Sequence, residues 1–302
     1  MPIAFHHCTD VTEHAMWLSG WQQEFDQIDE GSFVGEIIDI SEPGIRLFRE
    51  RANLAVSQLM RFPEDQWHLA MPLQWPNNSL FRSDAITVLP RCNEFLGISP
   101  AGYDLLVVSI DLNRHSWLEQ NARKSRVLAV TPDLFKMVKQ QWWALTEHLR
   151  TCSGEATPCT QQAIMCQLKE GIDLLLGSPS CTVVSDDSSN YRTRRYVVDR
   201  CHALSKMHPD NPPSMMALCQ QLNISRRTLQ YSFQAETGQS PVHYLRALRL
   251  NAVRRSLMRD PTLCLADAAA QQGFFHQSYF SREYRRLFLE LPSDTRKRSQ
   301  EA

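Results

Sequence analysis

The chain has 302 residues, of which 43% are hydrophobic and 22% are charged. This is an ordinary globular composition, and the length corresponds to about two domains of roughly 100–200 residues each. The longest apolar runs are far shorter than the ~18 residues needed to span a bilayer, and the N-terminus has no basic segment followed by an apolar stretch. We therefore expect no membrane segment, no secretory signal and a cytoplasmic location.

The formal net charge of −1 hides an asymmetry between two parts of the chain. Residues 1–190 contain 14 basic and 24 acidic side chains, a net charge of −10. Residues 191–302 contain 18 basic and 9 acidic side chains, a net charge of +9. Such a division predicts one domain that meets an anionic surface and one that does not.

The N-terminal segment predicts a helix that starts at Thr9 or Thr12 and runs to about Ile28. Its apolar residues recur at i, i+4, i+8 and i+11, which is the spacing of one face of an amphipathic helix. These residues are Trp17, Trp21, Phe25 and Ile28.

Between residues 31 and 110 the pattern changes to short apolar runs separated by turn signals such as Glu42-Pro43-Gly44. Strands of this length and spacing favour a β-sandwich or a barrel-like domain. The expected strands lie at residues 33–40, 45–48, 54–60, 67–73, 86–89 and 105–110.

Two longer helical patterns follow, over about residues 131–150 and 160–177. The second carries an apolar stripe that could pack on the first helix or on another subunit, and both interpretations stay open. The polar residues that come next are typical of a linker, and the charge balance changes sign there. We therefore predict an α+β protein with an effector-sensing and dimerisation domain at residues 1–178, a linker at 179–191 and an all-α domain at 192–302.

The C-terminal domain contains an internal repeat, in which residues 219–229 align with residues 270–280 at a spacing of 51. Each copy predicts a short helix, a tight turn and a second helix. The helices are expected at about 214–222 and 225–235 in the first copy, and at about 265–272 and 276–287 in the second. Ser225 suits a helix N-cap, and Gly273 suits the turn because glycine takes a positive φ without steric cost.

In each second helix the expected core positions match, with Leu229 and Phe233 in one copy and Phe280 and Tyr284 in the other. Helical periodicity then turns polar side chains outward near the N-terminal end, which is the part of a recognition helix that meets base edges in the major groove. The expected base-reading residues are Arg226, Arg227, Gln230, Tyr231, Gln277, Ser278, Ser281 and Arg282.

A long helix from Ser240 to about Met258 joins the two units. At 1.5 Å per residue it is roughly 27 Å long, which could hold the two recognition helices near the ~34 Å repeat of successive major grooves. Its arginines, including Arg255, are expected to remain free for phosphates or solvent. The two units and the positive charge predict double-stranded DNA as the partner. The expected phosphate contacts are Ser225, Arg246, Arg249 and Arg254.

Residues 192–302 resemble the AraC/XylS-type DNA-binding domain. The matching motifs are LCQQLNISRRTLQYSF, TGQSPVHYLRALRLNAV and GFFHQSYFSREYRRLF. The resemblance implies two helix-turn-helix units joined by a helix, and transcriptional regulation, for which we expect activation, a homodimer and RNA polymerase as a partner. Two positions depart from the family pattern: Leu289 stands where glycine is common, and Thr295 stands where an aromatic residue often precedes the final Arg296.

All seven tryptophans lie in the first 143 residues. Aromatic rings can line a ligand pocket, although filling a core is the more ordinary role of any single tryptophan. The segment TDVTEHAMWLSGWQQEFDQ, with GSFVGEI and LFRE, also resembles ethanolamine-operon and anthranilate-type regulators, which implies that the domain senses a small amine or aromatic acid. The candidates for the pocket are Trp17, Trp21, Trp67 and Trp75.

Two alternatives stay open beside a ligand-sensing regulator. The N-terminal domain could serve only for dimerisation or protein binding, or it could be a cysteine-based alkyl acceptor that uses Cys8 or Cys92. The sequence lacks a four-cysteine zinc arrangement, an HExxH motif and a Gly-rich phosphate loop, so we expect no enzyme and no cofactor. We also expect no metal site, because neither His6-His7-Cys8 nor the Cys159 and Cys166 pair has a second ligand pair at zinc-site spacing.

Overall fold

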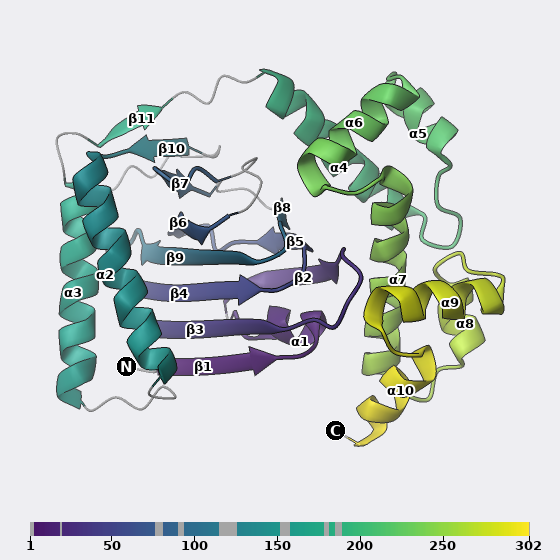
Figure 1. Cartoon of the computed structure of the whole chain (residues 1–302), viewed down its shortest axis with the longest axis horizontal. Helices are drawn as coiled ribbons and strands as arrows, with labels where there is room; N and C mark the ends of the chain where they lie inside the picture. Colours follow the sequence, from purple (N-terminus) through teal and green to yellow (C-terminus); the bar gives the residue numbers. More distant parts are fainter. Residues whose placement is uncertain are drawn as a thin grey trace.

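The computed structural model describes residues 3–18, 20–75, 81–89, 94–114, 126–151, 158–177, 181–184 and 189–301. It is an α+β structure of two lobes, with two sheets and three described helices in the N-terminal lobe and helices alone in the C-terminal lobe (Figure 1). This confirms the predicted fold class. Among the described residues, no helix is both long and apolar enough to cross a bilayer.

The N-terminal lobe is built on an eight-stranded sheet in which all paired neighbours run antiparallel. Five of the strands coincide with predicted apolar runs, while β1, β10 and β11 have no counterpart in the prediction. In spatial order the strands are β1 (Ile3–Cys8), β3 (Gly35–Glu42), β4 (Ile45–Ala52), β9 (Tyr103–Asp111), β6 (Gln66–Gln74), β7 (Ile86–Val88), β10 (Arg126–Ala129) and β11 (Thr182–Val184).

A smaller sheet of β2 (Gln22–Gln27), β5 (Val56–Arg61) and β8 (Phe95–Ser99) faces the large one. Alternate residues of each strand point to opposite faces, so both sheets contribute one apolar face to a common core. Phe25 and Met60 enter this core from the small sheet, and Phe48 and Val107 enter it from the large sheet. The predicted β-sandwich is therefore confirmed.

Two antiparallel helices cover the other face of the large sheet (Figure 1). They are α2 (Pro132–Thr151) and α3 (Pro158–Leu176), close to the two predicted helices. The buried side chains Phe135, Val138 and Trp142 of α2 pack on the sheet, and Leu168 and Ile172 of α3 join the same core. The sheet is thus apolar on both faces.

The predicted long helix from Thr9 or Thr12 to Ile28 is wrong. The helix α1 spans only Val11–Met16 and is capped by Asp10, whose side chain accepts from the amides of Thr12 and Glu13. The chain then turns at Gly20, which has a φ of +83°, and continues as β2. Pairing of β2 with β5 overrides the helical spacing, because strand formation depends on partners that lie far away in the sequence.

The C-terminal lobe contains seven helices among its described residues, and its core extends into the N-terminal lobe. Ile28, Ala55, Leu96 and Ile98, on or beside the outer face of the small sheet, share this core. Strand β11 lies inside the segment that we expected to be a linker, and α4 begins soon after it. The helices are α4 (Ser189–Met207), α5 (Met215–Leu222), α6 (Arg226–Thr237), α7 (Pro241–Arg259), α8 (Leu265–Ala270), α9 (Gln277–Phe288) and α10 (Pro292–Glu301).

Candidate nucleic-acid interface

The first helix-turn-helix unit consists of α5 and α6. Ser214 caps α5, which ends in Asn223 with a φ of 51°, a left-handed conformation that asparagine tolerates better than most residues. Ser225 caps α6, and its hydroxyl accepts from the amide of Thr228 at 3.0 Å. The tight turn and the predicted cap are therefore confirmed.

The second unit consists of α8 and α9, and its turn contains Gly273. This glycine has a φ of +71°, and a Cβ atom placed on it would lie 2.9 Å from Pro212 and 3.0 Å from the carbonyl oxygen of Asp210. Both the backbone angle and the space therefore require glycine, as predicted. At the other end of α9, Leu289 takes a φ of 56°, so a leucine occupies a left-handed C-cap where a glycine is more common.

The matched core positions of the two second helices are confirmed. Leu229 and Phe233 in α6, and Phe280 and Tyr284 in α9, are almost completely buried. Tyr244 of α7 packs edge-on against Phe233, and Phe280 packs against Tyr284. These contacts fix which face of each helix points outward.

The residues expected to read bases lie on the outward faces. Ser281 is half-buried, and the other seven are exposed: Arg226, Arg227, Gln230, Tyr231, Gln277, Ser278 and Arg282. The C-terminal ends of the same two helices face the N-terminal lobe, where Gln239 beyond α6 donates to Asp29 at 2.8 Å and Leu287 of α9 accepts from the amide of Gly31 at 3.0 Å. The N-terminal halves therefore extend away from that lobe (Figure 1).

Helix α7 joins the two units, with Ser240 as its cap and Pro241 in its first turn, as predicted. Arg246 lies 3.1 Å from the Glu283 carboxylate. The half-buried Arg249 donates to the carbonyl oxygen of Gln272 at 3.3 Å and lies over the ring of Phe274 at 4.6 Å. Both arginines thus hold the second unit against α7, and burial lowers the pKa of Arg249.

The expectation that Arg254 is free for phosphates or solvent is wrong. Its side chain is 6% exposed and lies 2.6 Å from Asp10 of the N-terminal lobe and 2.5 Å from Glu290. Burial alone would raise the pKa of Asp10, but the charge and hydrogen bonds of Arg254, with the amides of Thr12 and Glu13, outweigh burial and lower it. The residue forms a buried ion-pair network between the lobes.

Arg255 is also turned toward the N-terminal lobe instead of toward solvent. Its guanidinium lies 2.5 Å from Asp26 and 2.8 Å from Glu24, both on β2, and Glu24 is also paired with Lys206 at 2.5 Å. Complete burial raises the pKa of Asp26, although Arg255 draws it down. Some acidic side chains of the N-terminal lobe and some basic side chains of the C-terminal lobe therefore neutralise one another at the interface between the lobes.

Polar contacts align β2 with α7 beside these ion pairs. The amide of Gln27 donates to the Asn251 side chain at 3.0 Å, and that side chain donates back to the Gln27 carbonyl oxygen at 2.9 Å. The Ser57 and Tyr244 hydroxyls share a hydrogen bond of 2.9 Å. Sequence reasoning missed this interface. The sequence feature that could have indicated it is the opposite net charge of the two halves, because opposite charges also favour contact between the halves.

The four candidate tryptophans are dispersed. Trp17 is exposed and stacks on His6, and Trp67 is buried in the core between the large sheet and α2. Trp21 packs among Phe48, Phe62 and His68 inside the sandwich, and Trp75 packs against Phe81 and Tyr103. A solvent-accessible cavity of about 570 Å³ lies elsewhere, beside α2, and is lined by Trp143, which was not a candidate.

Cys8 does not suit alkyl-group transfer. It is buried, and burial raises the pKa of its thiol to about 12, so the nucleophilic thiolate is scarce near neutral pH. Cys92 lies outside the described residues. Within the parts of the chain that the structure describes, no cluster of three or more His, Cys, Asp or Glu side chains could hold a metal ion.

Comparison with known proteins places residues 218–298 in a family described as a helix-turn-helix domain. An XylDLEGF operon transcriptional activator of Pseudomonas putida is 36% identical over 84 residues, which cover 27% of this chain and 54% of that protein. The transcriptional activator RhaR of Pectobacterium atrosepticum is 28% identical over 165 residues, which cover 53% of this chain and 58% of that protein. The chain thus spans little more than half the length of these curated relatives.

Among solved structures, an AraC-type regulator of Chromobacterium violaceum is 24% identical, with a TM-score of 0.34, over 36% of this chain and 96% of that one. ToxT of Vibrio cholerae is 13% identical, with a TM-score of 0.32, over 92% of this chain and 97% of that one. Similarity at this level does not bear on function. The N-terminal resemblance to ethanolamine-operon and anthranilate-type regulators stays a prediction, because the family match lies in the C-terminal lobe. Residues 218–298 therefore match a helix-turn-helix domain family.

Proposed function

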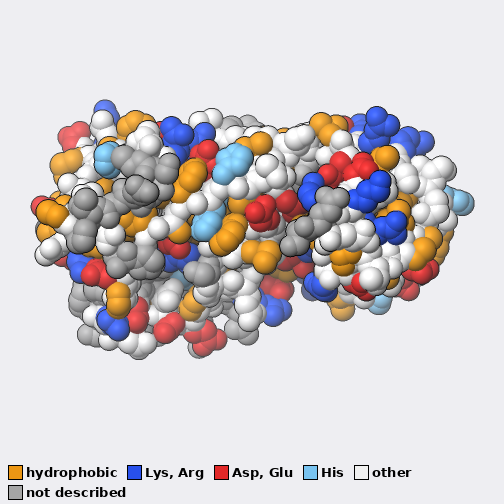
Figure 2. Space-filling view, turned by 90° about the horizontal axis from the view of Figure 1, so that it is seen from below, with side chains coloured by type: hydrophobic (Ala, Val, Ile, Leu, Met, Phe, Trp, Pro, Cys, Tyr) orange, Lys and Arg blue, Asp and Glu red, His pale blue; other side chains and the backbone are white. Residues whose placement is uncertain are grey.

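We propose that the protein is a transcriptional activator that binds double-stranded DNA in a sequence-selective way and responds to a small molecule. The observation that carries this proposal is the pair of helix-turn-helix units, whose second helices bury matching positions and expose matching ones. Two recognition helices on one joining helix can enter successive major grooves. In Figure 2, Lys and Arg side chains gather on the C-terminal lobe, as binding to phosphates requires.

In this proposal, α6 and α9 read bases and α7 with the cap of α6 contacts the backbone. The base-reading residues are Arg226, Arg227, Gln230, Tyr231, Gln277, Ser278, Ser281 and Arg282. The phosphate contacts are Ser225, Arg246 and Arg249. Arg254 is left out because its side chain is only 6% exposed and its guanidinium pairs with Asp10 and Glu290.

A series of polar contacts that leads from the large sheet to α7 supports a response to a small molecule. Tyr103 of β9 donates to Glu50 at 2.5 Å, and Gln58 of β5 donates to the same carboxylate at 2.8 Å. Ser57, the neighbour of Gln58, shares a hydrogen bond with Tyr244 of α7. A change in the large sheet can thus reach the helix that sets the spacing of the recognition helices, if these contacts shift together.

A homodimer and a contact with RNA polymerase complete the proposal. Met137 on α2 and Leu174 on α3 are large apolar side chains that remain 51% and 41% exposed. Such residues on neighbouring helices are suited to a subunit interface. Light scattering of the full chain is expected to give twice the monomer mass. Met137→Glu is expected to shift it toward the monomer, and a monomeric wild-type protein would contradict a dimer.

The DNA-binding proposal is tested by selection of binding sites from random double-stranded DNA, followed by fluorescence anisotropy over a range of salt concentrations. Arg227→Ala should lose about 1–3 kcal/mol of preference at particular base pairs. Arg249→Ala should weaken all sequences similarly and reduce the salt slope by about 1. Arg51→Ala, which removes the same charge from the N-terminal lobe, is the matched control. Absence of any preferred sequence for the wild-type protein would refute the proposal.

A further inference from the structure

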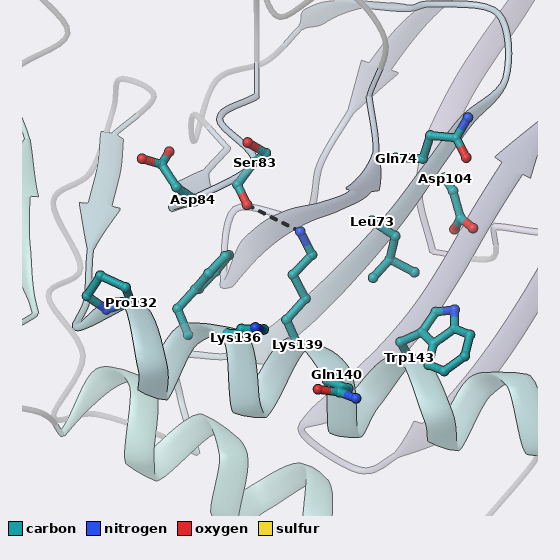
Figure 3. Close-up of a pocket in the computed structure, with 11 residues that line it drawn as sticks. Leu73, Gln74, Ser83, Asp84, Asp104, Pro132, Lys136, Lys139, Gln140 and Trp143 are labelled. Carbon is teal, nitrogen blue, oxygen red and sulfur yellow. Dashed lines mark hydrogen bonds between the residues drawn. The ribbon is translucent and has the colours of Figure 1, made fainter.

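A cavity of about 570 Å³ lies between α2 and the strands β6 and β9 of the large sheet, and its lining includes none of the four tryptophans that the sequence suggested (Figure 3). The lining residues of α2 include Pro132, Lys136, Lys139, Gln140 and Trp143, whose spacing places them on one side of the helix. The size falls within the ~300–1,000 Å³ typical of small-molecule sites.

The wall of the cavity is apolar on two sides. Phe135 of α2 is buried and Leu73 of β6 is half-buried, and together they form a floor. Trp143, which follows two turns later on α2, leaves 42% of its surface uncovered at the cavity. A flat or chain-like apolar group placed between these side chains would remove the exposed ring and the floor from water.

The acidic side chains in the cavity wall are paired with arginines, whereas the basic ones form no ion pair with a described residue. Asp104 is held by two hydrogen bonds from Arg49, at 2.8 and 2.7 Å, and Asp84 is held by two from Arg82, at 3.0 and 2.8 Å. Both carboxylates are thus neutralised by an arginine. These carboxylates should therefore repel an anion in the cavity only weakly.

The two lysines of the wall have no such partner. The ammonium of Lys139 donates to the carbonyl oxygen of Ser83 at 3.2 Å and lies 5.6 Å from the Phe135 ring centre (Figure 3). Lys136 is exposed, and neither lysine forms an ion pair within the described part of the chain. Burial lowers the pKa of Lys139, and Asp84 only partly offsets this, so the ammonium lacks the stabilisation that a bound anion would supply.

We propose that this cavity binds a small molecule that joins one carboxylate to an apolar aromatic or aliphatic body. The carboxylate lies between Lys136 and Lys139, and the body lies against Leu73, Phe135 and Trp143. The largely apolar wall favours a monoanion over a phosphate, whose stronger hydration it cannot replace. This inference rests on the proposed function, since it gives the chemical class of the effector.

The test is isothermal titration calorimetry of the full chain with benzoate and octanoate, their uncharged amides benzamide and octanamide, and inorganic phosphate. At least one carboxylate should bind. The corresponding amide should have an affinity at least about tenfold lower, and phosphate should not bind. Lys139→Gln should weaken the carboxylate about tenfold and leave the amide unchanged. Trp143→Leu should weaken both.

Lys169→Gln is the matched control, because Lys169 lies on α3 and pairs with Glu42 at 2.9 Å. Lys136→Gln, at an exposed position, provides a second variant if Lys139→Gln unfolds. Binding of no carboxylate, or equal carboxylate affinity in the wild type and both lysine variants, would overturn the inference. Parallel DNA-binding assays separate the two proposals: sequence preference without carboxylate binding refutes only the ligand, and carboxylate binding without sequence preference refutes only the regulator.

Discussion

The two sides of the C-terminal lobe use arginine in opposite ways. On the side that faces the N-terminal lobe, Arg254 and Arg255 are nearly buried and pair with Asp10, Glu24 and Asp26. At the N-terminal end of α6, Arg226 and Arg227 are exposed and form no ion pair with any described residue.

Net positive charge therefore does not by itself locate a DNA-binding surface. A buried arginine must be paired because desolvation of its charge is expensive, and its partner here comes from the acidic lobe. An exposed arginine keeps its hydration until a phosphate or a guanine displaces the water. The first kind should govern stability and the second DNA binding, and the arginine variants described below test this contrast.

The largest effect is expected for Arg254→Ala. Removal of this guanidinium leaves Asp10 and Glu290 without their main partner, and loss of one member of a buried ion pair costs about 3–5 kcal/mol of unfolding free energy. Urea denaturation measures this loss. Arg227→Ala is the matched control and should change the unfolding free energy by less than about 0.5 kcal/mol. Equal losses in the two variants would contradict the contrast.

A pH effect should follow from His68 inside the sandwich and His202 beside the interface. Burial lowers both pKa values to about 3, so both rings are neutral in the native state. The unfolded residues bind a proton near pH 6.5, so this stability is present above that pH and is lost as the pH falls from 6.5 toward 3.

At pH 5 the loss should be about 2 kcal/mol for each histidine. Urea denaturation at pH 7 and pH 5 is expected to show a smaller loss for His202→Gln than for the wild-type protein. His208 is exposed, so His208→Gln serves as the control and should lose as much unfolding free energy between pH 7 and pH 5 as the wild-type protein. An unchanged pH dependence in His202→Gln would show that this ring does not stay neutral on folding.

A smaller gain is expected at Leu289, which lies two residues after the Leu287 carbonyl oxygen that accepts from Gly31. Its left-handed φ costs a non-glycine residue about 1–2 kcal/mol, and glycine loses about 0.5–1 kcal/mol more backbone entropy on folding. Leu289→Gly should therefore raise the unfolding free energy by about 0.5–1 kcal/mol. Thermal denaturation checks this, and a lower midpoint would show that the exposed leucine side chain contributes packing.

The smallest effect is expected for Arg286→Ala. Arg286 pairs with Glu30 across the same interface at 2.6 Å, but its side chain is 57% exposed. An exposed pair gains little because water and salt screen it. The urea midpoint should stay within measurement error of the wild type. A loss as large as that of Arg254→Ala would mean that contact across the interface, and not burial, decides the contribution.

Much of the C-terminal lobe could be predicted because its signals are local. The turn at Gly273, the caps at Ser225 and Ser240, and the core positions Leu229 and Phe280 follow from residue type and helical periodicity. Each needs information from only a few neighbouring residues. The outward faces of α6 and α9 follow from the same periodicity.

Local residue patterns were sufficient to predict the two helix-turn-helix units, six of the strands and the division of charge. Burial of Arg254 depends on tertiary packing, because its partner Asp10 lies 244 residues away and no local pattern links them. The strand at residues 22–27 also depends on tertiary structure, because it forms by pairing with β5. The cavity likewise arises where α2 meets β6 and β9, so its lining is a property of packing and not of the spacing of tryptophans.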